Sequence, residues 1–143
     1  MSKTELQIAS HFESLPPSKS HDLQLLHSFI LSINPACKLW FDNGINDDGK
    51  VVANPTIGYG ALSLQYANGT SRDFFQIGIC STSTGISVYI IGLKDKLYLK
   101  EKFASSIGKA SVTGYCVKFK AMKDINENVL KELITFGFSE RTN

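Results

Sequence analysis

The histidines, serines and glycine-rich segments of this chain lack the spacing that common catalytic motifs require. His11, His21 and His27 are its only histidines, and none of them stands in an HExxH or i, i+4 arrangement. No serine lies in a G-x-S-x-G turn, and Gly108-Lys109 lacks the upstream glycine and the downstream hydroxyl residue of a phosphate-binding loop. His27 falls on or near the apolar stripe of a predicted helix, where a packed, hydrogen-bonded histidine is the expected role. We therefore favour a binding protein over an enzyme and expect no resident cofactor. An enzyme without a recognisable motif is the third hypothesis, and a deep pocket that holds a titratable pair would support it.

A group of aromatic residues gives the sequence its main indication of ligand binding. These residues fall in the part of the chain that is predicted to form a sheet, where Tyr89 points opposite to Val88 and Ile90. A sheet with aromatic residues on both faces either has helices on both sides or exposes a concave ligand-binding surface, and the sequence leaves both open. The candidate ligand-binding residues are Trp40, Tyr59, Tyr66, Phe74, Tyr89 and Lys118.

Charged residues are distributed unevenly, although the net charge is only +2. Residues 94–123 hold eight lysines and two acidic residues, a cluster that either attracts anions or keeps the surface solvated. The weak net charge does not favour a nucleic-acid partner. Asp42, Asp47 and Asp48 gather in one segment, but their spacing is not that of an EF-hand, and we interpret the segment as a turn.

The three cysteines, Cys37, Cys80 and Cys116, are typical of a reducing compartment. Their odd number and wide spacing do not fit a disulfide framework, and no two of them form a CxxC pair. Residues 1–14 contain no apolar run, and the longest apolar stretches are far shorter than the roughly 20 residues of a membrane span. We therefore expect a soluble, cytoplasmic protein with no membrane partner, and the sequence does not indicate its oligomeric state.

Apolar residues at helical spacing predict four helices, two near each end of the chain. Asp124 and Glu127, three residues apart, resemble a capping box that opens the last helix. Proline and glycine supply most of the predicted ends, because neither continues a helix well. The predicted helices run over 4–14, from a cap at Ser20 to Asn34-Pro35, from a cap at Asp95 to Gly108, and from Asp124 to Gly137.

Between these helices the apolar period changes to two, which predicts β-strands. The alternating runs cover 62–66, 74–79, 86–91 and 115–120, and turn residues separate the first three. Short connections favour antiparallel neighbours, because a parallel pair needs a long crossover. The sequence therefore predicts one α+β domain over residues 1–143, with an antiparallel sheet of about five strands packed with N- and C-terminal helices in the order ααββββαβα. Gly58-Tyr59-Gly60 suggests a bulge or a close approach of two backbones.

Several motifs with consistent spacing resemble the YdhG-like domain of unknown function. They are Pro55–Gly60, Tyr66–Gly69, Asp73–Phe75, Val88–Ile90, Ile107–Lys109, Cys116–Lys120 and Lys123–Asn126. The chain is similar to this family from about residue 20 to residue 136. The resemblance implies a fold of helices on an antiparallel sheet, in agreement with the periodicities.

The chain also departs from the pattern of this family. Related domains tend to carry a tryptophan where Phe74 stands and basic residues where Thr70, Thr82 and Ser83 stand. About a dozen residues, near 41–52, are inserted before the glycine motif. If the basic groups of the family bind an anion, this chain has lost several of them, and Arg72 is the nearby substitute.

The resemblance implies a second function, because one branch of the family is described as frataxin-like, an intracellular iron chaperone. Iron outside a cluster prefers oxygen or imidazole ligands. Under this alternative the metal-binding residues are Glu5, Glu13 and Asp22, with the acidic segment 42–48, and iron is the only cofactor. The first hypothesis is a binding module that recognises a small molecule or a protein through the aromatic residues and Lys118.

Overall fold

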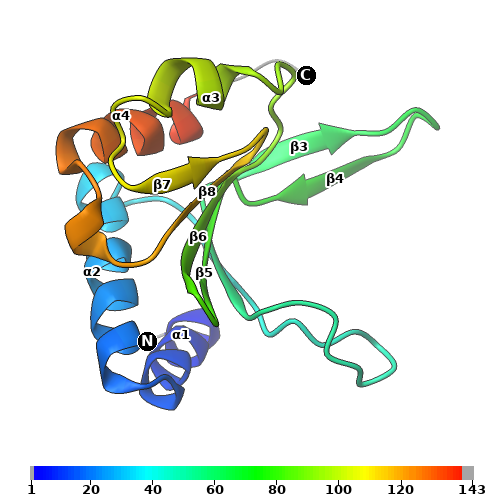
Figure 1. Cartoon of the computed structure of the whole chain (residues 1–143). Coiled ribbons are helices and arrows are strands. Elements are labelled where there is room, and N and C mark those ends of the chain that lie inside the picture. The colour runs from blue at the N-terminus through cyan, green and yellow to red at the C-terminus, as the bar shows by residue number, and fades with distance from the viewer. Residues whose placement is uncertain (1, 140–143) are drawn as a thin grey trace.

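The structure is a computed structural model that describes residues 2–139, and it contains the helices and the antiparallel sheet expected from the two periodicities (Figure 1). The helices are α1 (Lys3–Ser14), α2 (Pro17–Ile33), α3 (Tyr98–Phe103) and α4 (Glu127–Phe138), with a 3-10 turn η1 (Met122–Asp124) before α4. The strands are β1 (Leu39–Asp42), β2 (Thr56–Tyr59), β3 (Leu62–Gln65), β4 (Ser71–Phe74), β5 (Ile77–Thr82), β6 (Gly85–Ile90), β7 (Ala110–Val112) and β8 (Cys116–Phe119).

Six strands form the main sheet, in the order β1-β2-β5-β6-β8-β7, and every neighbouring pair is antiparallel. The predicted α+β class is therefore confirmed, with six strands where about five were expected. Strands β3 and β4 form a separate two-stranded hairpin. This hairpin and the loop 43–55 project on the side of the sheet opposite to α1, α2 and α4 (Figure 1).

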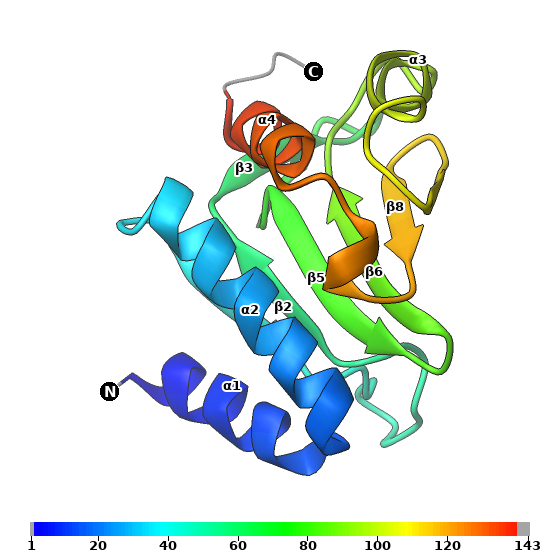
Figure 2. The same ribbon diagram turned by 60° about the vertical axis from the view of Figure 1, so that its left-hand side comes forward.

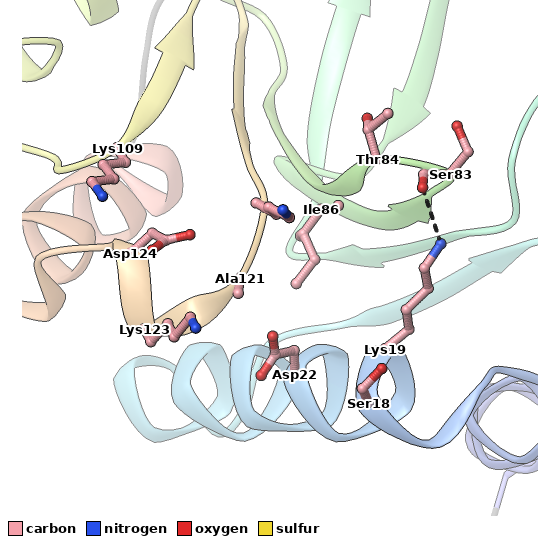
Figure 3. Close-up of a pocket in the computed structure, with 12 residues that line it drawn as sticks. Ser18, Lys19, Asp22, Ser83, Thr84, Ile86, Lys109, Ala121, Lys123 and Asp124 are labelled. Atoms are coloured by element: carbon pink, nitrogen blue, oxygen red, sulfur yellow. Dashed lines mark hydrogen bonds between the residues drawn. The ribbon is translucent and has the colours of Figure 1, made fainter.

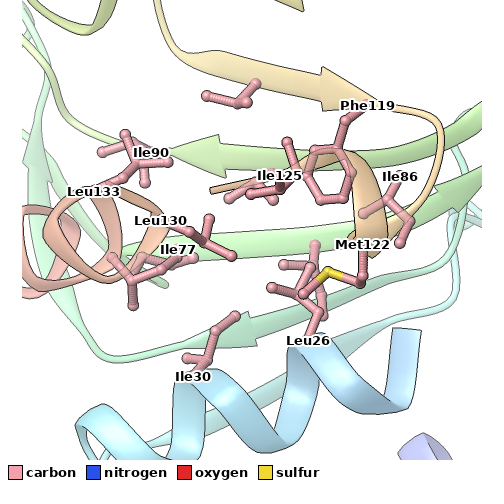
Figure 4. Close-up of a cluster of buried hydrophobic side chains, with 14 of the residues drawn as sticks. Leu26, Ile30, Ile77, Ile86, Ile90, Phe119, Met122, Ile125, Leu130 and Leu133 are labelled. Carbon is pink, nitrogen blue, oxygen red and sulfur yellow. The ribbon is translucent and has the colours of Figure 1, made fainter. Parts of the chain in front are cut away.

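Within residues 2–139, helices cover one face of the main sheet and not the other, and we call this face the covered face. Helix α2 lies across the strands, α4 lies beside one end of it, and α1 packs against α2 and β1 (Figure 2). Alternate residues of each strand point towards these helices, so apolar side chains from both layers meet. Leu26 and Ile30 of α2 face Ile77 of β5, and Leu130 of α4 joins the same cluster (Figure 4). These side chains are almost completely buried and form the hydrophobic core.

The other face of the main sheet, which we call the open face, has no helix of the described residues over it (Figure 1). The aromatic residues left open whether helices cover both faces of the sheet or leave one face exposed. Among the described residues, one face is left without helices. Gly58 and Gly78 are paired on this face, and a Cβ atom at Gly58 would lie 2.5 Å from the Phe75 ring. The close approach predicted at the glycine motif is therefore present, and the Phe75 ring fills the space that the two glycines leave.

Three predicted helix starts were wrong. Helix α3 begins at Tyr98 with Leu97 as its N-cap, and Asp95, the expected cap, accepts a hydrogen bond from the Leu97 N–H at 3.0 Å. Helix α2 begins at Pro17 with Pro16 as its N-cap, because proline fits the first turn, where its missing N–H costs nothing. Ser20 lies within the helix, and its hydroxyl donates to the Phe12 carbonyl at 2.7 Å, tying α2 to α1. At α4 the N-cap is Asn126, whose side chain accepts hydrogen bonds from the backbone of the first turn, instead of the expected capping box.

Two further boundaries differ from the prediction. Helix α3 ends at Phe103, and the chain then turns into β7, a strand that the sequence did not reveal. The run 74–79 is not one strand, because β4 ends at Phe74 and β5 begins at Ile77. The intervening corner places Phe75 on the open face, whereas Ile77 points into the core.

Candidate functional site

The open face carries a group of polar side chains on the three adjacent strands β5, β6 and β8. Cys80 is paired with Ser87, and Ser87 with Lys118, so these three residues form one row across the sheet. Tyr89 is paired with Cys116 in the next row. Because all five positions have the same parity on their strands, their side chains share the open face. The structure thus brings together Tyr89 and Lys118, two of the six residues predicted to bind a ligand.

The two thiols in this group are buried and unreactive. Burial raises the pKa of Cys80, and hydrogen bonds from Tyr89 and Ser87 and the charge of Lys118 oppose this effect only in part. Burial likewise raises the pKa of Cys116, again against the charge of Lys118. A thiol whose pKa is raised stays protonated at neutral pH and is a poor nucleophile. We assign the thiols to packing, beneath the polar surface.

Tyr89 has a different role from the thiols because it is only partly buried. Its hydroxyl lies 3.7 Å from the Cys80 sulfur, and burial, aided by Cys80, raises the pKa of Tyr89 to about 12. The phenol therefore keeps its proton at neutral pH and remains a hydrogen-bond donor. The Tyr115 ring stacks on the Tyr89 ring with centroids 5.9 Å apart, which gives the open face an exposed aromatic surface.

A cavity of about 530 Å³ lies on the open face beside Tyr89, and we call it the open-face cavity. Three lysines line it, and no acidic residue does. The other lining groups include four hydroxyl side chains of Thr82, Thr84, Ser87 and Ser111. Lysine ammonium groups and hydroxyls donate hydrogen bonds, so this lining suits an anionic group such as a phosphate. The lysines are Lys109, Lys118 and Lys120.

A second cavity of about 620 Å³, the end cavity, lies where the β5–β6 turn, α2 and η1 meet (Figure 3). Lys19 crosses from α2 to that turn and donates to the carbonyls of Thr82 and Ser83, at 2.8 and 3.4 Å. Lys123 and Asp124 line the side opposite to Lys19. Asp22 of α2 lies between Lys19 and Lys123 (Figure 3). The end cavity therefore mixes positive and negative groups, unlike the open-face cavity.

Trp40 and Phe74, also predicted to bind a ligand, pack against each other at the other end of the open face. Their ring centroids are 6.2 Å apart, and Phe75 contacts both. The Trp40 indole N–H donates to the Gly60 carbonyl at 2.7 Å. A cation already lies over each ring, Lys38 at 4.1 Å from Trp40 and Arg72 at 4.9 Å from Phe74. Cation–π contacts of this kind occupy the surface that a stacking ligand would use.

Tyr59 and Tyr66 do not join the other predicted residues. Tyr59 points to the covered face, has no exposed surface, and its hydroxyl lies 2.7 Å from Nδ1 of His27. This contact explains His27 as a packed, hydrogen-bonded histidine, and burial lowers the pKa of His27. Tyr66 is exposed at the turn of the β3–β4 hairpin. The sequence placed these tyrosines in the sheet region, but it did not say which face or which sheet each occupies.

The acidic residues of the iron hypothesis have separate surroundings. Glu5 belongs to the capping box of α1, and Asp22 accepts a hydrogen bond from the Met122 N–H at 3.3 Å. Asp42 accepts from the Gly44 N–H, as in an ordinary turn. Within residues 2–139, no three His, Cys, Asp or Glu side chains come together in a group that could hold a metal ion. The iron hypothesis, with Glu13 as its remaining residue, stays a prediction.

Sequence reasoning missed Ser87, Ser111, Lys109 and Lys120 as members of the site. Ser87 was the easiest to find, because it alternates with Ile86 and Val88 just as Tyr89 does. Ser111 and Lys109 depend on β7, which was not predicted. The lysine cluster at 94–123 was noted, but only the pairing of β7 with β8 shows which lysines lie together.

Comparison with known proteins found no family model, no curated protein and no solved structure that matches this chain. The resemblance to the YdhG-like domain therefore stays a prediction. Among residues 2–139, no helix has both the length and the apolar character needed to cross a membrane.

Proposed function

We propose that this protein is a binding module that holds a small anionic molecule in the open-face cavity. The observation that carries the proposal is the lining of that cavity, where three lysines occur without a carboxylate to neutralise them. Lys118 lies on β8, and Lys109 and Lys120 lie immediately beyond the β7–β8 pair, so the three charges repel one another, and a bound anion relieves this repulsion. The anion therefore gains more from this cavity than from three lysines spread over the surface.

The dimensions and the remaining groups of the cavity favour a small molecule. Its volume of about 530 Å³ is within the range of typical small-molecule sites, roughly 300–1,000 Å³. Hydroxyls of Ser87 and Ser111 flank Lys118 on both sides, since both residues are its strand partners. Tyr89 and the stacked Tyr115 offer an aromatic surface to the uncharged part of the ligand. The whole arrangement suits a phosphorylated compound with a planar or apolar portion.

A thermal-shift comparison of AMP with adenosine tests this proposal, because the two probes differ only in the phosphate. We expect AMP to raise the unfolding temperature and adenosine to have little effect, since a ligand stabilises the folded state that binds it. The shift is expected to shrink as salt rises from about 50 to about 300 mM, because salt screens exposed charges.

The matched variants are Lys118→Gln, in the cavity, and Lys131→Gln, on the exposed surface of α4 and outside both cavities. Each removes one positive charge from the protein. We expect Lys118→Gln to weaken AMP binding about three- to tenfold, the size of one charge-assisted hydrogen bond at a partly exposed site. Equal effects of the two variants, or no response to AMP in the parent protein, would show that the open-face cavity is not an anion site.

A further inference from the structure

We propose that the open-face cavity and the end cavity form one two-part site, which takes a small molecule carrying two separated phosphate groups. This inference rests on the proposed function, because it assigns the first phosphate to the open-face cavity. The observation behind it is that the two cavities share part of their lining. Thr84, Ile86, Lys109 and Lys120 line both of them.

The shared residues place two lysines at the junction of the cavities. Ala110 of β7 is paired with Phe119 of β8, and Lys109 and Lys120 lie immediately beyond this pair, where β7 begins and β8 ends. Both lysines are exposed. From this position beside the β7–β8 pair, both side chains line the open-face cavity and also the end cavity.

The end cavity adds two lysines of its own, Lys19 and Lys123. The ammonium group of Lys19 is held by two carbonyls of the β5–β6 turn, so its charge stays beside Thr84 at the junction. Lys123 is exposed on η1, at the far side of the cavity (Figure 3). A second anionic group in the end cavity would therefore have Lys123 as well as the shared Lys109 and Lys120 in its lining.

Asp22 and Asp124 make the end cavity less positive than the open-face cavity. One of these carboxylates, Asp22, is already engaged by the Met122 backbone N–H. Across both cavities, five lysines still face two aspartates. We infer that the end cavity holds the more weakly bound phosphate, which gains affinity because the first phosphate tethers it nearby.

The test compares three adenosine phosphates by isothermal titration calorimetry on the full chain. AMP carries one phosphate, ADP carries two that are adjacent, and adenosine 3′,5′-bisphosphate carries two that the ribose separates. We expect the bisphosphate to bind about tenfold more tightly than AMP, since a tethered second contact acts at high effective concentration. We expect ADP to bind less tightly than the bisphosphate, because its two phosphates are adjacent, whereas the proposed site takes two separated phosphates.

The variants divide the site into its parts. Lys118→Gln is expected to weaken both AMP and the bisphosphate about three- to tenfold, whereas Lys123→Gln weakens the bisphosphate about tenfold and AMP less than about threefold. Lys131→Gln is the control for loss of charge and is expected to change neither affinity.

The possible failures are distinguishable. If AMP binds and Lys118→Gln weakens it, but the bisphosphate binds no better than ADP, the two-part site is wrong and the proposed function stands. The two-part site is also wrong if Lys123→Gln weakens AMP and the bisphosphate equally. If none of the three phosphates binds, the proposed function and this inference fail together.

Discussion

The two faces of the six-stranded sheet are built from alternate residues of the same strands, yet their chemistry is opposite. In β6, Ile86, Val88 and Ile90 belong to the hydrophobic core, whereas Ser87 and Tyr89 lie on the open face. Helices α1, α2 and α4 contact the covered side of the sheet, α3 packs against β7 and joins the same core, and none of the described helices lies over the open face. The comparison shows that a single strand supplies buried core side chains on one side and the polar surface of the proposed binding site on the other.

The two faces differ for a physical reason: burial stabilises aliphatic side chains, whereas hydration stabilises charged ones. Burying an aliphatic side chain contributes about 1.5–3 kcal/mol, so the covered face supplies most of the stability. A lysine gains nothing comparable from burial and keeps its charged end in water. Substitutions on the covered face should therefore change stability, and substitutions on the open face should change binding.

The largest effect is expected for Ile79→Ala on the covered face. Ile79 has no exposed surface and packs in the core beneath the helices. Its truncation removes buried methyl groups and leaves a cavity, which should lower the free energy of unfolding by about 2–5 kcal/mol. Urea denaturation measures this change, and Leu25→Ala, at an exposed position of α2, is the control with an effect of about 0.5 kcal/mol or less. If Ile79→Ala lowers the free energy of unfolding by less than about 1 kcal/mol, the covered face does not supply most of the stability.

A smaller effect on the covered side concerns pH. Burial lowers the pKa of His27 from its usual 6.5, and also the pKa of His11. The groups that face His27 are the Tyr59 hydroxyl and the Phe12 ring, neither of which carries a charge at neutral pH. The folded protein therefore favours neutral imidazoles, while the unfolded chain takes up protons as the pH falls through about 6.5.

The sign of this effect follows from the proton balance. Because the unfolded state binds more protons, stability is complete above about pH 6.5 and decreases as the pH falls below it. Thermal unfolding between about pH 7.5 and pH 5.5 should show this decrease, and His27→Gln should make it shallower. An unfolding temperature that rises on acidification in this range, or a slope that His27→Gln leaves unchanged, would contradict the assigned burial of His27.

The sequence predicted the alternation of faces in β6 and β8, but it misplaced Phe75 in the run 74–79 and did not predict which face the helices cover. Tyr59 and Tyr89 illustrate this limit, because each alternates with its neighbours in a strand. One tyrosine is buried against His27 and the other lies beside the open-face cavity. The choice depends on where α2 and α4 pack, and that is a long-range contact which a period of two does not encode.

The helix ends and the site residues were predicted only in part. The end of α2 at Asn34-Pro35 was confirmed, since proline restricts the residue before it. The start at Ser20 was wrong because Pro17 fits the first turn of α2, and the start at Asp124 was wrong because the Asn126 side chain caps α4. The candidate site was predicted in part, through Tyr89 and Lys118. Its other lysines, Lys109 and Lys120, meet only through the pairing of β7 with β8.

The smallest effect on stability is expected for Tyr89→Phe on the open face. The substitution removes one weak contact, the 3.7 Å approach of the hydroxyl to the Cys80 sulfur, and keeps the ring that stacks on Tyr115. The free energy of unfolding should therefore change by about 0.5 kcal/mol or less. The counterpart on the covered face, Tyr59→Phe, removes the hydrogen bond to Nδ1 of the half-buried His27 and should cost about 0.5–1.5 kcal/mol.

Binding should reverse the order of these two tyrosine variants. The Tyr89 hydroxyl keeps its proton, because the pKa of Tyr89 is about 12, and it can donate to a ligand that lies beside it in the open-face cavity. Its loss should weaken AMP about two- to fivefold, the value of one neutral hydrogen bond, whereas Tyr59→Phe should leave the affinity of the folded protein unchanged. Calorimetric titration at a temperature where both variants are folded measures the two affinities. Because Tyr59 cannot reach the open face through the sheet, equal losses for both variants would mean that the two faces are coupled and that the division between stability and binding is wrong.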